Sequence, residues 1–75
     1  MSNFWDKQEI VGRVDKNKRE QVVVSKCERQ GKEYLDVRIY AKLSNNDETV
    51  PTSKGFAIEK EMAKEIESLM QEALK

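Results

Sequence analysis

Basic and aromatic side chains recur at alternate positions between residues 32 and 42, and side chains of these two kinds can bind nucleic acid. Single-stranded nucleic acid offers phosphates to Lys and Arg, and exposed base faces to flat rings. The candidate contacts are Lys26, Arg29, Lys32, Tyr34, Arg38, Tyr40, Lys42 and Lys54. An ordinary half-solvated sheet shows the same alternation of polar and apolar residues. The sequence pattern alone therefore leaves both interpretations open.

The sequence contains few residues or motifs typical of catalysis, metal binding or nucleotide binding. The sequence has no histidine and one cysteine, which excludes zinc sites built from Cys and His clusters and Ser-His-Asp triads. The run Ser53-Lys54-Gly55 is not preceded by a phosphate-loop pattern. Carboxylates are abundant, but nothing in the sequence places two of them in one cleft. We therefore expect no catalytic residue, no metal and no cofactor.

Length and composition bound the possible architectures. The chain has 75 residues, of which 37% are hydrophobic and 37% are charged. A chain of this length forms one small domain with a modest core, which a partner can complete. No segment approaches the roughly 20 apolar residues of a membrane span, and the N-terminus lacks the pattern of a signal peptide. Together with the lone Cys27, which cannot form an internal disulfide, this predicts a cytoplasmic protein without a membrane partner.

Charge is unevenly distributed although the formal net charge is zero. Residues 13–32 contain seven basic and three acidic side chains, whereas residues 59–75 contain five Glu and three Lys. A local field of this kind can steer a charged ligand even when the total charge cannot.

The elements that position these residues follow from periodicity and turn chemistry. Strands are expected at about residues 8–14, 20–28, 33–42 and 53–58, with Gly12 as a possible bulge and Gly31 at the centre of a hairpin turn. Residues 44–47 are typical of a turn, and Pro51 cannot donate to a central ladder. Residues 1–7 form an N-terminal tail, and residues 8–75 form the single domain.

Alternation along the third strand separates two faces. Leu35, Val37 and Ile39 point one way and predict a core face. The other face carries the tyrosines and Arg38 and is the candidate binding face. The run Val22-Val23-Val24 cannot be assigned to a face by alternation.

The adjacent Phe4 and Trp5 are unusual so close to a terminus. We favour the interpretation that one ring caps the edge of the core, because large aromatic side chains mostly serve packing. A role in base stacking or in an interface is the alternative.

A helix is expected at about residues 59–74, because apolar residues recur there at spacings of three and four among strong helix formers. The apolar stripe is wide enough to cover a sheet and a partner helix at once. The candidate dimer-interface residues are Met62, Ile66, Leu69, Met70 and Ala73.

Three short motifs, taken in order, resemble the positive cofactor four family of transcriptional coactivators and their bacterial and phage relatives. They are the turn Gly31-Lys32, the strand segment Asp36-Val37-Arg38 and the step Lys54-Gly55-Phe56-Ala57-Ile58 before the helix. The resemblance covers roughly residues 20–72. It implies an α+β fold with a four-stranded, strongly curved antiparallel sheet followed by one C-terminal helix (ββββα), which dimerises through the helix and the sheet ridge.

The resemblance also implies a function. Lys32, Arg38 and Lys54 match basic contacts to unpaired DNA in that family, and Tyr40 lies at or beside an aromatic position. Arg29 stands where the family often has an aromatic stacker, and Ser53 where it often has a further basic residue. We therefore expect a homodimeric, non-catalytic module that binds single-stranded DNA or RNA, acting with transcription, replication or repair proteins and at the nucleoid if the host is bacterial. The alternative is a protein-interaction module that keeps the fold without the ligand.

Overall fold

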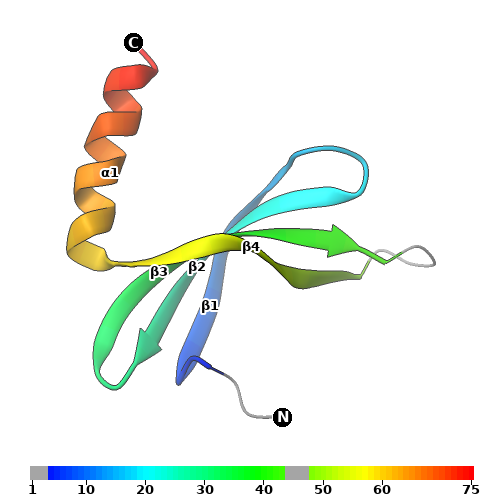
Figure 1. Cartoon of the computed structure of the whole chain (residues 1–75), viewed down its shortest axis with the longest axis horizontal. Coiled ribbons are helices and arrows are strands. Elements are labelled where there is room, and N and C mark those ends of the chain that lie inside the picture. Colours follow the sequence, from blue (N-terminus) through cyan, green and yellow to red (C-terminus); the bar gives the residue numbers. More distant parts are fainter. Residues whose placement is uncertain (1–3, 44–47) are drawn as a thin grey trace.

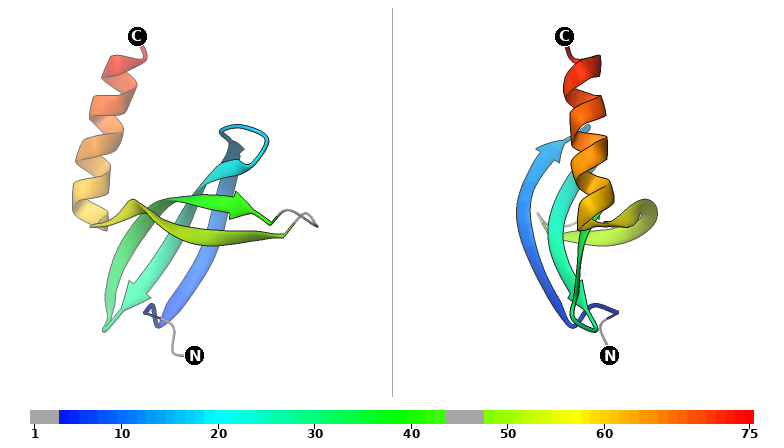
Figure 2. Two further views of the ribbon diagram at one scale, coloured as in Figure 1. Left: turned by 45° about the vertical axis from the view of Figure 1, so that its right-hand side comes forward. Right: turned by 90° about the vertical axis from the view of Figure 1, so that its left-hand side faces the viewer.

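A computed structural model describes residues 4–43 and 48–75 of the chain. Four strands and one helix follow each other as β1 (Lys7–Asp15), β2 (Glu20–Arg29), β3 (Lys32–Lys42), β4 (Thr49–Glu59) and α1 (Lys60–Ala73). The strands form one antiparallel sheet in the order β1-β2-β3-β4. The sheet is strongly curved, and the helix rises away from it (Figures 1 and 2). The predicted ββββα arrangement is confirmed. The expected turn at residues 44–47 lies outside the described residues.

The β2–β3 hairpin has the tight turn that the sequence predicted. Arg29 pairs with Lys32, and the two residues between them, Gln30 and Gly31, have φ angles of 52° and 81°. Two successive positive φ angles give the turn the twist that matches two right-twisted strands. Glycine adopts such angles readily, whereas Gln30 needs support. Its backbone N–H donates to the carboxylate of Asp6 (N···O 2.8 Å).

Irregularities in two strands shift the register. In β1 the pairing shifts between Ile10 and Gly12, which leaves Val11 as the extra residue of a bulge. In β4 the pairing shifts further: Gly55 pairs with Arg38, and Pro51 pairs with Tyr40, so that residues 52–54 lie opposite Ile39 alone. Strand β4 also begins at Thr49, four residues earlier than expected, and includes Pro51. Because β4 is an edge strand, its proline interrupts no ladder on the outer side.

Burial corrects the predicted assignment of the two faces. We call the side with Tyr34, Asp36, Arg38 and Tyr40 the tyrosine face, and the side with Leu35, Val37 and Ile39 the open face. Cross-strand partners share a face, so the tyrosine face also carries Val23, Ser25 and Cys27. All the buried residues of the described chain lie on this face: Val23, Ser25, Cys27, Asp36 and Tyr40. Leu35, Val37 and Ile39 on the open face are only half-buried.

The helix covers neither face of the sheet. None of its residues is buried, and it contacts only β3 and β4. Its first residue is tied to the sheet by an ion pair between Lys60 and Glu33 (Nζ···Oε2 2.9 Å). The apolar flank that the sequence predicted is therefore left uncovered by this chain.

Candidate nucleic-acid interface

Six of the predicted contact residues share the tyrosine face. The strand register places Arg29, Lys32, Tyr34, Arg38, Tyr40 and Lys42 on this side. The face runs from the β2–β3 turn at one end to Lys42 at the other. The fold thus brings basic and aromatic groups together as the sequence pattern indicated, although their exposure to a ligand differs widely.

Arg38 is held inside this face by an acidic neighbour. Its guanidinium donates to both carboxylate oxygens of Asp36 (2.9 and 3.1 Å) and to the carbonyl oxygen of Thr52 (3.0 Å). The hydrogen bonds to Asp36 raise the pKa of Arg38, although burial acts in the opposite direction. An arginine committed in this way has little capacity left for a phosphate. Its first role is to neutralise a carboxylate that is 2% exposed.

Tyr40 is also part of the interior. The residue is 8% exposed, and the guanidinium carbon of Arg13 lies 5.8 Å from the centre of its ring. A base cannot stack on a ring that the protein already covers. This burial corrects the expectation that Tyr40 is available for stacking and identifies it as a packing residue.

Arg13 is a cationic group of this face that the sequence patterns missed. It pairs with Val23 across the sheet, and its Nη1 donates to Thr49 Oγ1 (3.1 Å) and Gln21 Oε1 (3.4 Å). Arg13 and Lys42 both line a hollow of about 530 Å³ at the end of the face remote from the hairpin. The extra residue of the bulge at Val11 reverses which side chains of β1 point to which face. Alternation in the sequence therefore could not have assigned Arg13 to the tyrosine face.

The exposed part of the face lies at the β2–β3 turn. Lys32 is exposed, whereas Arg29 and Tyr34 are half-buried. Two further rings from the N-terminal segment join them, with Trp5 5.3 Å from Tyr34 and Phe4 62% exposed. Trp5 supports the packing interpretation of the aromatic pair, because it is half-buried against the sheet. Phe4 does not share that burial.

Lys26 and Lys54 do not join this group. Lys26 pairs with Leu35 and therefore lies on the open face. Lys54 lies near Glu20, which is at the opposite end of β2 from the hairpin turn. The pKa of the Glu20 carboxyl is lowered chiefly by a hydrogen bond from Asn17, and the charge of Lys54 adds to the effect. Neither lysine is placed beside the cations of the hairpin end, so the tertiary structure divides the predicted set.

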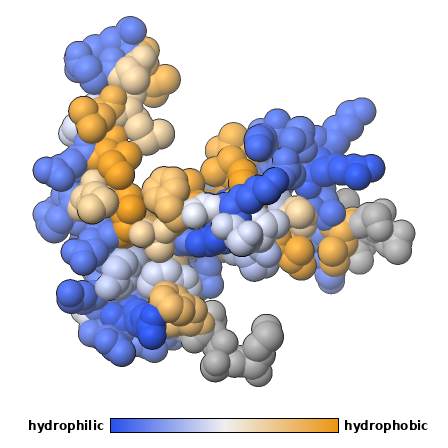
Figure 3. All heavy atoms as spheres, in the orientation of Figure 1, coloured by the Kyte–Doolittle hydropathy of each residue, from blue (hydrophilic) through white to orange (hydrophobic). Residues whose placement is uncertain are grey.

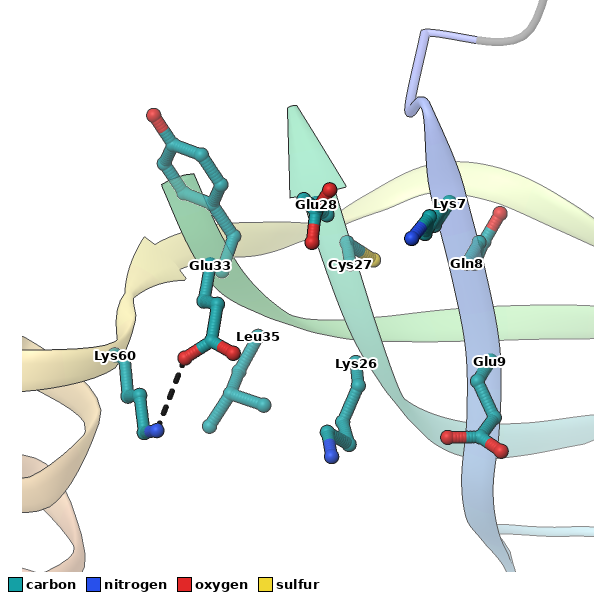
Figure 4. Close-up of a pocket in the computed structure, with 10 residues that line it drawn as sticks. Lys7, Gln8, Glu9, Lys26, Cys27, Glu28, Glu33, Leu35 and Lys60 are labelled. Carbon is teal, nitrogen blue, oxygen red and sulfur yellow. Dashed lines mark hydrogen bonds and ion pairs between the residues drawn. The ribbon is translucent and has the colours of Figure 1, made fainter. Parts of the chain in front are cut away.

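A hollow of about 500 Å³ on the open face has a different character (Figure 4). The Lys60–Glu33 ion pair lines it, and the hydrogen bond between them lowers the pKa of Glu33 and raises that of Lys60. Lys26 and Glu9 face each other across β1 and β2 in the same hollow. Positive and negative groups alternate here, so this surface does not select an anion.

The apolar flank of the helix forms a second candidate surface. Met62, Leu69 and Met70 are 52%, 69% and 61% exposed, and Phe56 on β4 is 49% exposed. Figure 3 shows apolar side chains along the helix and over the adjoining middle of the sheet. Ile66 is half-buried, and Ala73 is exposed. An exposed apolar surface of this kind is a candidate interaction site.

Within residues 4–43 and 48–75, no cluster of three or more acidic, Cys or His side chains could hold a metal ion. Burial raises the pKa of the single thiol, Cys27, and the carboxylate of Asp36 adds to the effect. A thiol of this kind is a poor nucleophile. No helix in the described part of the chain has the length and apolar character needed to cross a membrane.

Comparison with known proteins gives structural matches only. No family model matches the sequence, and no curated protein does. Two solved structures match, both of a PC4 (positive cofactor 4) homolog from Burkholderia pseudomallei. The tetragonal crystal form has a TM-score of 0.78 and 22% sequence identity, over 92% of this chain and 100% of that chain. The orthorhombic form has a TM-score of 0.73 and 25% identity, over 95% and 96%. The resemblance to this family that the sequence motifs indicated is thus confirmed at the level of the fold.

Proposed function

We propose that this chain, whose fold is that of the PC4 homolog, is a homodimeric, non-catalytic module that binds single-stranded nucleic acid. Unpaired DNA is the ligand of first choice, and RNA is the second. The module would act in the cytoplasm, in transcription, replication or repair. Two features of the structure support this proposal, one for the ligand and one for the dimer.

The observation that carries the proposal is the hairpin end of the tyrosine face. Lys32 is exposed there beside Arg29, and the ring of Tyr34 lies between these cations and the buried part of the sheet. Cations meet phosphates, whereas rings need bases whose faces are free. A duplex withholds those faces, so this combination favours single strands.

The uncovered helix supports the dimer. A helix with its apolar flank exposed would be unstable in water by itself, because most helical stability in proteins comes from packing. The open face of the sheet adjoins that flank and is also only half-buried. A second copy that covers both surfaces would complete the core that a 75-residue chain lacks.

A protein-interaction module remains the competing function, and two observations favour it. The net charge is zero. Arg38 and Tyr40, two of the predicted nucleic-acid contacts, are engaged within the protein itself.

A binding titration with labelled oligonucleotides separates the two functions. We expect a thymine single strand to bind more tightly than a duplex of the same length at equal salt, and an RNA strand of matched sequence tests the second ligand. Equal affinity for single strand and duplex would indicate a purely electrostatic surface. Absence of binding at low salt would leave the protein-interaction module as the function.

A further inference from the structure

The N-terminal segment Phe4–Asp6 is fastened to the β2–β3 hairpin. The backbone N–H of Asp6 donates to the carbonyl oxygen of Glu28 (2.8 Å), and the Asp6 carboxylate accepts from the backbone N–H of Gln30 (2.8 Å). The second bond supports the positive φ of Gln30 in the turn. The segment is therefore held at a fixed place on the hairpin by bonds that do not involve its two rings.

These bonds place three aromatic rings and one cation in a continuous row. The rings of Tyr34 and Trp5 lie 5.3 Å apart at 45°, and those of Trp5 and Phe4 lie 4.9 Å apart at 88°. The guanidinium carbon of Arg29 lies 3.9 Å from the centre of the Phe4 ring. The innermost ring of the row is the half-buried Tyr34, and the outermost ring is Phe4, which is 62% exposed.

Packing alone does not account for the outermost ring. A ring that served the core would be buried, as Tyr40 is on the same sheet, but Phe4 keeps most of its surface in water. Arg29 covers part of the ring and carries a positive charge beside the surface that remains free. A flat ring next to a guanidinium is complementary to one unit of a nucleic-acid strand, because the base can stack while the phosphate meets the cation.

We propose that Phe4 and Trp5 form a base-stacking platform for an unpaired nucleobase, with Phe4 as the stacking ring and Arg29 as the contact for the adjoining phosphate. This inference rests on the proposed function and extends the binding surface beyond the sheet to the N-terminal segment. Trp5 and Tyr34 act as positioning residues that support Phe4 from the side of the sheet. The two hydrogen bonds of Asp6 preorganise the platform, so a base binds to it without the entropic cost of ordering a loose segment.

Trp5 is the only tryptophan of the chain, so its fluorescence reports on this site alone. We expect a thymine oligonucleotide to change the emission of Trp5, and an abasic oligonucleotide of equal length and charge to change it much less. Phe4→Ala should weaken binding of the thymine strand about five- to tenfold. Phe4→Leu should weaken binding similarly, because leucine preserves apolar surface without a flat face. Val11→Ala provides a matched control, since Val11 is equally exposed (61%) but lies on β1 away from the platform.

A further variant tests the hydrogen bond between the Asp6 carboxylate and the hairpin turn. Asp6→Ala keeps both rings but removes the bond to Gln30, and we expect it to weaken binding while leaving the slope of affinity against salt unchanged. Thermal unfolding of each variant shows whether the fold is retained.

The outcomes separate this inference from the proposed function. If the parent binds the thymine strand but Phe4→Ala binds equally well with the emission of Trp5 unchanged, the platform is refuted and the proposed function stands. If the parent binds neither oligonucleotide, both proposals fail. If Phe4→Ala instead shifts the oligomeric state without affecting oligonucleotide binding, the exposed ring is a protein contact and the platform is likewise refuted.

Discussion

Asp36 and Arg38 lie two residues apart on β3 and form a two-point ion pair on the buried face of the sheet. Oδ1 of Asp36 is 2.9 Å from Nη2 of Arg38, and Oδ2 is 3.1 Å from Nε. The side chains are 3% and 24% exposed. The arginine that the motif pattern marked as a phosphate contact therefore neutralises a carboxylate of the same strand.

This pair predicts a large loss of stability when only the arginine is removed. Arg38→Met leaves the buried carboxylate of Asp36 without a partner and should lower the free energy of unfolding by about 3 kcal/mol. The double variant Asp36→Leu/Arg38→Met should recover much of that loss, because no lone charge remains. Urea unfolding followed by circular dichroism measures both. Lys32→Met serves as the control for removing an exposed cation, and equal midpoints for Arg38→Met and Lys32→Met would contradict the structural role.

Gly55 is required by a close backbone approach. A Cβ atom built there would lie 2.5 Å from the carbonyl oxygen of Val37 and 2.6 Å from Cα of Arg38. Because neither backbone atom can move freely, Gly55→Ala should lower the free energy of unfolding by about 1–3 kcal/mol. Gly12→Ala is the matched control, since nothing lies within 4 Å of its Cβ position. Equal urea midpoints for the two variants would show that β4 relaxes without cost.

The uncovered helix predicts that a charge on its apolar flank changes the oligomeric state. Leu69 is 69% exposed in the single chain, so Leu69→Asp buries no charge within one chain. In a dimer the same carboxylate would be buried without a partner, at a cost of several kcal/mol. Light scattering should therefore show a dimer for the parent and a monomeric or unfolded species for Leu69→Asp. Gln71→Asp adds the same charge on the opposite flank of the helix and should remain dimeric. A parent that is monomeric at micromolar concentration would refute the proposed dimer.

The division of the lysines between two faces predicts different salt effects. Lys32 is exposed at the hairpin end of the tyrosine face, whereas Lys26 is exposed on the open face. Loss of one phosphate contact flattens the dependence of log affinity on log salt by about 0.7 on single strands. Lys32→Gln should flatten the slope by about this amount per subunit, and Lys26→Gln should leave it unaltered. A titration of oligonucleotide affinity at several salt concentrations measures the slopes. An equal effect of both substitutions would show that the oligonucleotide does not prefer the tyrosine face to the open face.

Local chemistry in the sequence predicted the elements and most of their order. The alternation from Tyr34 to Tyr40 was enough to predict β3, and Gly31 between two polar residues was enough to predict the hairpin turn. The three- and four-residue spacing of Met62, Ile66 and Leu69 predicted the helix. The start of β4 was placed too late, because Pro51 reads as a break unless the strand is known to be an edge.

In the third strand the sequence by itself determined which residues share a face, whereas the tertiary structure decided which face lies inside. Alternation assigns Leu35, Val37 and Ile39 to one set and Asp36, Arg38 and Tyr40 to the other. It does not tell which of the two sets faces the interior. Hydropathy suggested the apolar set as the core. Packing across the strands instead buried Asp36 and Tyr40 of the other set, which share their face with Val23, Ser25 and Cys27. Register shifts at Val11 and opposite Ile39, which depend on how whole strands pair, decided where Arg13 and Lys54 lie. Contacts between residues distant in sequence, such as Asp6 with Gln30, positioned Phe4 and Trp5, and no local pattern encodes them.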